Sequence, residues 1–266
     1  MYEGKTVFVN GGKSAETLIK SLMHNGGMPA DKIHVVNEKL AGTLAQTCGL
    51  TEAVKYPDAM YGADIVIVDA SAGASSVIPP LSVWLKEEAV VLFLDADEPL
   101  EQLIALVGGH GCAAQAVLSP LAAVGRGYSG IVPSAACGEA QIGAVVSLLE
   151  GIGKTMVLEE GRLPVFRALS KAEPALYLSL LTAMGDAGVY VGFNREDARS
   201  VTMENMLVTA KLLQETGKHP LEITDTWTSP SGVTIEALYE TYKTCYEKIV
   251  LEGVEAALAQ PGAAPK

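Results

Sequence analysis

Short apolar runs alternate with helical patterns through the first part of the chain. The strongest run, at 64–69 (DIVIVD), is rich in β-branched residues, which is typical of a strand buried on both faces of a parallel sheet. Similar runs lie at 6–9, 33–36 and 89–95, with weaker ones at 112–118 and 155–158. Helical patterns at 15–25, 40–47 and 139–150 separate them. This alternation predicts βαβ units and a doubly wound sheet.

The pattern changes after Glu159, where strand signals stop. Three long helices are predicted at 163–188, 195–215 and 233–258. Asn194 precedes the second one as a candidate N-cap, and acidic residues follow it in the first turn. The predicted fold is therefore α/β, with a Rossmann-type domain at 1–159 followed by an all-α domain at 160–266.

The predicted helical domain is unusually apolar, with a continuous run at 175–181 (ALYLSLL). Helices that are hydrophobic nearly all round need more partners than a three-helix unit provides. We therefore expect a homodimer, or a higher oligomer, in which two helical domains interlock.

Charge narrows the classes of partner. The 266 residues carry a net charge of −12, and 49% of them are hydrophobic, which excludes a disordered chain. Nucleic acids and anionic membranes need a positive surface and are not expected as partners. A phosphorylated cofactor stays possible, because the N-terminus of a helix binds phosphate without help from global charge.

The four cysteines are scattered and form no C-x-x-C pair, so neither a metal site nor a disulfide framework is expected. The N-terminus has no signal-peptide pattern, and no run approaches the roughly 20 apolar residues of a membrane span. We expect a cytoplasmic protein with reduced thiols.

A glycine-rich turn follows the first predicted strand. Dinucleotide-binding turns have the pattern G-x-G-x-x-G/A, which lets the backbone approach a pyrophosphate. Here Asn10 replaces the first glycine, whereas Gly12 and Ala15 fit, and Asn tolerates positive φ better than most residues. The candidate cofactor-binding residues are Asn10, Gly11, Gly12, Lys13 and Ser14. A P-loop is the rival interpretation, but the loop is too short to wrap a triphosphate.

Asn37 and Glu38 follow the second predicted strand, where adenosine ribose usually binds. The Glu38 carboxylate would accept a hydrogen bond from a ribose 2′-hydroxyl and repel a 2′-phosphate, which favours NADH over NADPH. The alternative is that Glu38 only opens a surface loop or helix.

Several short segments, spread along nearly the whole chain, occur in an order and spacing typical of one enzyme family. They are REDA at 195–198, TAKLL at 209–213, His219-Pro220, TSPSGVT at 228–234, DAGV at 186–189, VGRG at 124–127 and GIGK at 151–154. In order and spacing they resemble the pyrroline-5-carboxylate reductases. The resemblance implies a nicotinamide-dependent reductase that converts 1-pyrroline-5-carboxylate to proline. It also implies that the substrate carboxylate is held by Ser229, Ser231, Gly232, Val233 and Thr234.

Departures from the family pattern cluster at the expected sites. Ser71, a candidate cofactor-binding residue, stands with Ala72 where the family has Lys-Pro. The Ser-Gly-Ser-Gly-Pro-Ala turn is SKAEPA at 170–175, and the family's substrate-facing threonine falls at Asn205. Glu173, in that altered turn, and Asn205 are the candidate catalytic residues.

Two explanations of these departures stay open. In one, Lys171, Glu173 and Asn205 reshape the pocket of an imine reductase for an altered substrate. In the other, hydride transfer is lost and a dimeric binding or regulatory protein remains. Lys171 and Glu173 could also simply bridge each other in a solvated loop.

Overall fold

The computed structural model describes residues 2–36, 55–70 and 80–259, together with positions 41, 44, 48 and 50. The chain forms two compact units. The first contains the described residues up to Lys171 together with Leu258 and Ala259, and the second contains residues Ala172–Ala257. The long helix α6 (Leu163–Tyr190) begins in the first unit and continues into the second. A domain boundary between residues 159 and 160 stays a prediction.

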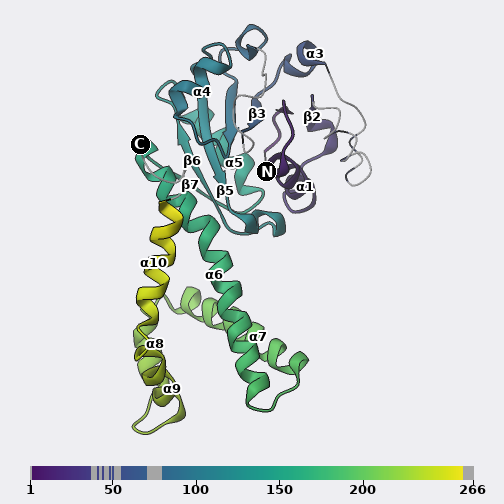
Figure 1. Cartoon of the computed structure of the whole chain (residues 1–266). Coiled ribbons are helices and arrows are strands. Elements are labelled where there is room, and N and C mark those ends of the chain that lie inside the picture. Colours follow the sequence, from purple (N-terminus) through teal and green to yellow (C-terminus); the bar gives the residue numbers. More distant parts are fainter. Residues whose placement is uncertain are drawn as a thin grey trace. The chain divides into compact units, whose positions relative to one another are not determined.

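The first unit is built on a sheet of seven strands in the order β2-β1-β3-β4-β5-β6-β7 (Figure 1). The strands are β1 (Thr6–Phe8), β2 (Ile33–Val35), β3 (Ile65–Asp69), β4 (Val90–Leu94), β5 (Ala113–Leu118), β6 (Tyr128–Pro133) and β7 (Lys154–Val157). All neighbouring pairs are parallel except β5 and β6, which are antiparallel. The doubly wound α/β fold is confirmed. Strand β6 was not predicted, because its sequence YSGIVP has no continuous apolar run.

Helices cover both faces of this sheet. The described ones are α1 (Lys13–His24), α3 (Tyr56–Met60), α4 (Leu100–Leu106) and α5 (Glu139–Glu150). Short 3-10 turns lie at η1 (Ala30–Lys32), η2 (Leu81–Val83), η3 (Pro120–Val124) and η4 (Glu160–Arg162). The predicted helix at 40–47 lies mostly outside the described residues.

Side chains of β3 show how the two core layers form. Ile65 and Ile67 pack into one apolar layer with residues of α1 and α5, whereas Val66 and Val68 pack into the other with α3 and α4. Because successive side chains of a strand point to opposite faces, a strand covered on both sides must be apolar throughout. The continuous run at 64–69 predicted this arrangement.

Two of the matched glycine segments meet in the structure. The Lys154 amide donates to the Gly127 carbonyl at 2.8 Å. A Cβ atom on Gly153 would lie 2.6 Å from that same carbonyl oxygen, and Gly153 has a φ of 150°. Only glycine allows this close backbone approach, so the two segments hold the start of β7 against the start of β6.

The second unit contains the rest of α6 and the helices α7 (Arg195–Thr216), α8 (Pro220–Trp227), α9 (Val233–Tyr242) and α10 (Tyr246–Leu258, whose last residue belongs to the first unit). The Asn194 side chain caps α7 by accepting a hydrogen bond from the Asp197 amide at 2.9 Å, as predicted.

The single helix predicted at 233–258 is wrong, because it breaks between α9 and α10. Cys245 has a φ of 50°, which an α-helix cannot accommodate. The Cys245 amide instead closes a tighter turn by donating to the Tyr242 carbonyl at 3.0 Å. Neither glycine nor proline marks this break in the sequence.

In a single copy of the chain, only two of the apolar residues described in the second unit are buried, Ala198 and Ile223. Large apolar side chains are exposed instead, such as Leu178 and Leu207 at 66% each and Val233 at 89%. Such a surface is far more apolar than a folded unit of this kind keeps in water. None of the described helices is long and apolar enough to cross a membrane.

Candidate functional site

The candidate site lies where β1 meets α1, at the carboxyl edge of the parallel strands. Strand β1 pairs with β2 on one side and with β3 on the other. Helices α1 and α3 pack on opposite faces of the sheet. In open α/β sheets a crevice forms at such a switch point, outside the carboxyl ends of the strands, and ligands bind there.

Asn10 joins the end of β1 to the end of β3 through its side chain. Its amide nitrogen donates to the Asp69 carbonyl at 2.7 Å, and its amide oxygen accepts from the Asp69 backbone N–H at 2.8 Å. These two bonds continue the backbone pairing that ends with Val9 and Ile67. The expected reason for Asn at this position is wrong, because Asn10 is not among the residues with positive φ. The side chain extends the sheet instead.

The N-terminus of α1 has two kinds of donor. Gly12 is the N-cap, with an extended backbone and no side chain to cap the helix. The Asp69 carboxylate, 4% exposed, takes that role from β3 by accepting from the Ala15 amide at 2.7 Å. Because first-turn amides have no partner within a helix, those of Lys13 and Ser14 are positioned to donate to an external anion.

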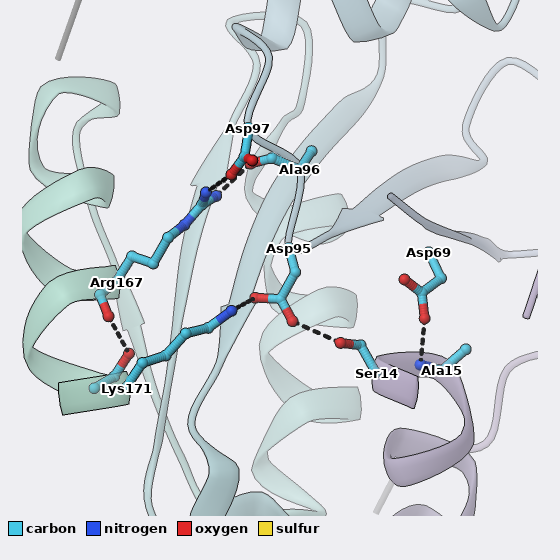
Figure 2. A network of polar contacts seen from close by, with 9 residues as sticks. Ser14, Ala15, Asp69, Asp95, Ala96, Asp97, Arg167 and Lys171 are labelled. Atoms are coloured by element: carbon cyan, nitrogen blue, oxygen red, sulfur yellow. Dashed lines mark hydrogen bonds and ion pairs between the residues drawn. The ribbon is translucent and has the colours of Figure 1, made fainter. Parts of the chain in front are cut away.

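Asp95, directly after β4, is the centre of a second set of contacts. Ser14 donates its hydroxyl hydrogen to one carboxylate oxygen at 2.7 Å, and the Lys171 ammonium lies 3.0 Å from the other (Figure 2). The Asp95 side chain is 7% exposed and that of Lys171 is 44% exposed. Asp95 also has a φ of 53°, a strained conformation of the kind that concentrates at functional sites.

Arg167 makes a parallel connection one turn earlier on α6. Its guanidinium donates to the Asp97 carboxylate and to the Ala96 carbonyl (Figure 2). The start of α6 is therefore fixed to the loop after β4 by two cations, and one of them reaches the carboxylate that holds Ser14. The first unit thus contains a continuous polar network from α6 to α1.

Asp69, Asp95 and Asp97 were not among the predicted site residues. A signal was available, because Asp69 and Asp95 are the last residues of predicted strands and Asp97 follows two positions after Asp95, where side chains reach the carboxyl edge of the sheet. The P-loop interpretation fits poorly, because Ser14 is bound to Asp95 and only Val9–Gly12 link β1 to α1.

The other predicted residues have separate outcomes. Asn37, Glu38 and Ser71 lie outside the described residues. Lys171 pairs with Asp95, so the suggested Lys171–Glu173 bridge is wrong. Glu173 is half-buried on α6, where burial and then the Glu173 charge raise the pKa of Tyr177.

The predicted substrate loop belongs to the second unit and leads into α9. Ser231 adopts a φ of 60°, and the Gly232 amide donates to the Ser229 carbonyl at 2.9 Å. Gly232 is the N-cap of α9, so Val233 and Thr234 supply the first-turn amides. Asn205 is exposed on α7. Among the described residues, no three His, Cys, Asp or Glu side chains are grouped so as to hold a metal ion.

This donor set fits a dinucleotide. Helix α1 offers amides at the switch point, Gly12 places no side chain beside them, and the exposed Lys13 adds a positive charge. The two buried acids nearby are compensated, since Asp69 lies at the positive end of α1 and Asp95 is paired with Lys171.

Comparison with known proteins gives one consistent answer. Residues 160–262 match the family model for pyrroline-5-carboxylate reductase dimerisation. The pyrroline-5-carboxylate reductase of Glycine max is 26% identical over 253 residues, covering 94% of this chain and 92% of the relative. That of Pseudomonas aeruginosa is 27% identical over 261 residues, covering 95% of this chain and 94% of the relative.

The fold agrees with these matches. The crystal structure of Plasmodium falciparum pyrroline carboxylate reductase with NADP bound superposes with a TM-score of 0.82 at 17% identity, covering 99% of this chain and 98% of that one. Relatives of one kind match nearly the full length, and the family model matches the helical part. On these grounds the chain is similar to the pyrroline-5-carboxylate reductases along nearly its whole length, and residues 160–262 match the dimerisation domain of that family.

Proposed function

We propose that this protein is a nicotinamide-dependent imine reductase, which reduces 1-pyrroline-5-carboxylate to proline or a related cyclic imine carboxylate to its amine. The observation that carries the proposal is the α1 N-terminus at the switch point, with the amides of Lys13 and Ser14 available to an anion. Similarity to pyrroline-5-carboxylate reductases over nearly the whole chain supports the same reaction class.

The cofactor would bind along the carboxyl edge of β1, β3 and β4. Gly11, Gly12 and Lys13 would hold the pyrophosphate through backbone N–H groups and the Lys13 charge. Ser14 has another task, since its hydroxyl hydrogen goes to Asp95. Asn10 would set the path of the turn through Asp69 rather than touch the ligand.

NADH is proposed over NADPH on the sequence of 37–38 alone. Asn37 and Glu38 follow β2, whose carboxyl end borders the same crevice. A carboxylate there accepts from a ribose 2′-hydroxyl and repels a 2′-phosphate. A preference for NADPH in the binding experiment below would contradict this part. Ser71, which follows β3 in sequence, is proposed to line the same crevice.

The substrate carboxylate is proposed to bind at the N-terminus of α9. The amides of Val233 and Thr234, the Gly232 N-cap and the hydroxyls of Ser229 and Ser231 form a donor set of the kind that anions prefer. The left-handed turn at Ser231 brings the chain into the helix at this point.

Reduced nicotinamide supplies the hydride, and a protonated imine is already electrophilic. The tasks of the protein are therefore to bind the carboxylate, to orient the imine carbon and to exclude water. Glu173 and Asn205 are proposed as the polar side chains that contact the substrate, with Asn205 donating or accepting where the family has a threonine. Each of these two roles can be tested by replacing the residue singly and measuring the activity.

A homodimer that forms through the helical unit is part of the proposal. A higher oligomer that uses the same surface is the alternative. Exposed apolar side chains on α6, α7 and α9 support it, and the matched family model is one for dimerisation. The four cysteines are scattered along the sequence without a C-x-x-C pair, which supports the proposal of a reducing, cytoplasmic location.

The first experiment is a titration of the full-length protein with NADH and NADPH, followed by nicotinamide fluorescence. Binding of NADH at micromolar concentration is expected, with weaker binding of NADPH. Binding of neither at millimolar concentration would end the reductase proposal and favour a binding or regulatory role. If NADH binds, pyrroline-5-carboxylate and a panel of ring-size and carboxylate-free imines would define the substrate.

A further inference from the structure

Cys112 and Cys137 lie side by side although 25 positions separate them in the sequence. Their Sγ atoms are 3.3 Å apart. Cys112 directly precedes β5, and Cys137 lies in the turn between β6 and α5. The antiparallel pairing of β5 with β6 brings the two turns together, since Ala114 is opposite Pro133.

Hydrogen bonds on both sides hold the two thiols in place. The Ser134 amide donates to the Ala113 carbonyl at 2.8 Å, and its hydroxyl donates to the Gly111 carbonyl at 2.7 Å. The Cys137 thiol donates to the same Ala113 carbonyl at 3.3 Å. A disulfide needs a sulfur separation of about 2.05 Å, so the two Sγ atoms have to approach each other by a little over 1 Å to form the bond.

The two thiols differ in access. Cys112 is 7% exposed, whereas Cys137 is half-buried and reachable from solvent. Burial, followed by the hydrogen bond and charge of Cys137, raises the pKa of Cys112 to about 12. Because Cys137 is the more accessible of the two thiols, it is the group that meets an oxidant first.

We propose that Cys112 and Cys137 form a reversible intramolecular disulfide when the protein meets a peroxide. In the first step the Cys137 sulfur attacks one oxygen of hydrogen peroxide, giving a sulfenic acid and releasing water. In the second step the Cys112 sulfur displaces hydroxide from that sulfenic acid, and the proton of Cys112 completes a second water. The thiols together lose two electrons and two protons, and one peroxide becomes two waters. A dithiol such as dithiothreitol restores both thiols by exchange.

The bond would form at the amino end of β5, opposite the edge that holds Asn10, Asp69 and Asp95. It is therefore independent of the proposed reductase activity. It would tie the start of β5 to the start of α5, and we expect NADH binding to be the same in both redox states.

The test uses the reduced, full-length protein treated with hydrogen peroxide and then denatured for thiol titration. The free thiols are expected to fall from the four of the sequence to two, and to return after dithiothreitol. Trypsin cuts at Arg126, between the two cysteines, so non-reducing digestion should release one cross-linked peptide pair.

Matched variants separate this pair from the other thiols. Cys245→Ser should form the same cross-linked peptides, because Cys245 is exposed and belongs to the second unit. Cys137→Ser and Cys112→Ser should both lose them. Four thiols after millimolar peroxide, a cross-link through Cys48 or Cys245 alone, or sulfinic acid at Cys137 without a cross-link would overturn the proposal. Peptide mapping of the parent protein shows whether the Cys112–Cys137 cross-link forms, even if a variant does not fold.

Discussion

The ammonium of Lys171 lies 3.0 Å from one carboxylate oxygen of Asp95, while Ser14 donates to the other. Because the Asp95 side chain is buried and that of Lys171 is half in water, the carboxylate depends on the pair more than the ammonium does. The contact therefore fixes a buried charge beside the turn that is proposed to bind the cofactor.

Removing the ammonium tests this dependence. Lys171→Met leaves Asp95 with Ser14 as its remaining partner in this network, and we expect the free energy of unfolding in urea to fall by about 1–3 kcal/mol. Lys211→Met is the matched control, because Lys211 and Glu215 are both well exposed and such pairs contribute about 0–1 kcal/mol. Adding Asp95→Asn to Lys171→Met should recover part of the loss. Equal losses for both lysines would contradict the interpretation.

Lys13 is expected to contribute to cofactor affinity. Lys13→Ala should raise the Kd for NADH about fivefold, which corresponds to roughly 1 kcal/mol, and should make binding less sensitive to salt. Lys20→Ala is the control on the same helix, where Lys20 pairs with Glu16. Equal effects of the two substitutions would show that general charge, and not the turn, attracts the cofactor.

Asn10 offers a direct choice between sequence pattern and structure. Asn10→Gly restores the usual glycine but removes both bonds to Asp69. We expect it to lower the free energy of unfolding by about 1–3 kcal/mol and to weaken NADH binding. Gln214→Ala, on the exposed surface of α7, serves as the control. A more stable or tighter-binding Asn10→Gly variant would disprove the role given to the Asn10 side chain.

Asp64 predicts a pH dependence of stability. Partial burial by itself would raise the pKa of this carboxyl, but hydrogen bonds from Lys86 and from the Lys5 amide at 2.7 Å outweigh it, and the pKa lies below its usual 3.8. A depressed pKa stabilises the folded state above the unfolded value, and this stabilisation is lost as the pH falls through the folded value.

Asp64→Asn should therefore unfold more easily than the parent protein at about pH 7, by about 0.5–1 kcal/mol because the side chain is partly exposed. The difference should shrink as the pH falls from about 4 to below 3. Urea unfolding at several pH values measures it, with the exposed Asp31→Asn as control. A difference that stays constant down to about pH 2.5 would contradict the assignment.

The exposed apolar surface of the helical unit predicts that the protein self-associates. Sedimentation at micromolar concentration should give a dimer or a larger assembly, and a double variant, Leu178→Glu with Leu207→Glu, should weaken it. Both leucines are two-thirds exposed in the single chain. Leu106→Glu, on α4 of the first unit, is the control. A monomeric parent protein would refute the homodimer.

The sequence predicted those elements whose signal lies within the element itself. Strand β3 and helix α5 follow from periodicity and glycine stops, and the Asn194 cap follows from a local hydrogen bond. Strand β6 and the break at Cys245 were not predicted. Strand β6 is held by its pairing with β5 and β7, and the break is set by the backbone conformation of Cys245.

The sequence predicted where the candidate site lies but not the side-chain contacts within it. The glycine turn and its helix are where the pattern put them. The ion pair of Lys171 and Asp95 joins segments that are far apart in the sequence, and nothing near Lys171 indicates its partner. From the sequence, the bridge to Glu173, a neighbour along the chain, was one alternative for Lys171 beside a role in the pocket.

The side-chain bridge from Asn10 to Asp69 also bears on how such turns are recognised. A motif search that counts glycines scores this turn as damaged, although its backbone leads from β1 into α1 in the usual way. Glycine in the pattern stands for a path of the chain, and here an amide side chain secures that path from the neighbouring strand. Profiles that allow Asn at the first position together with a strand-ending Asp would recover chains that glycine counting discards.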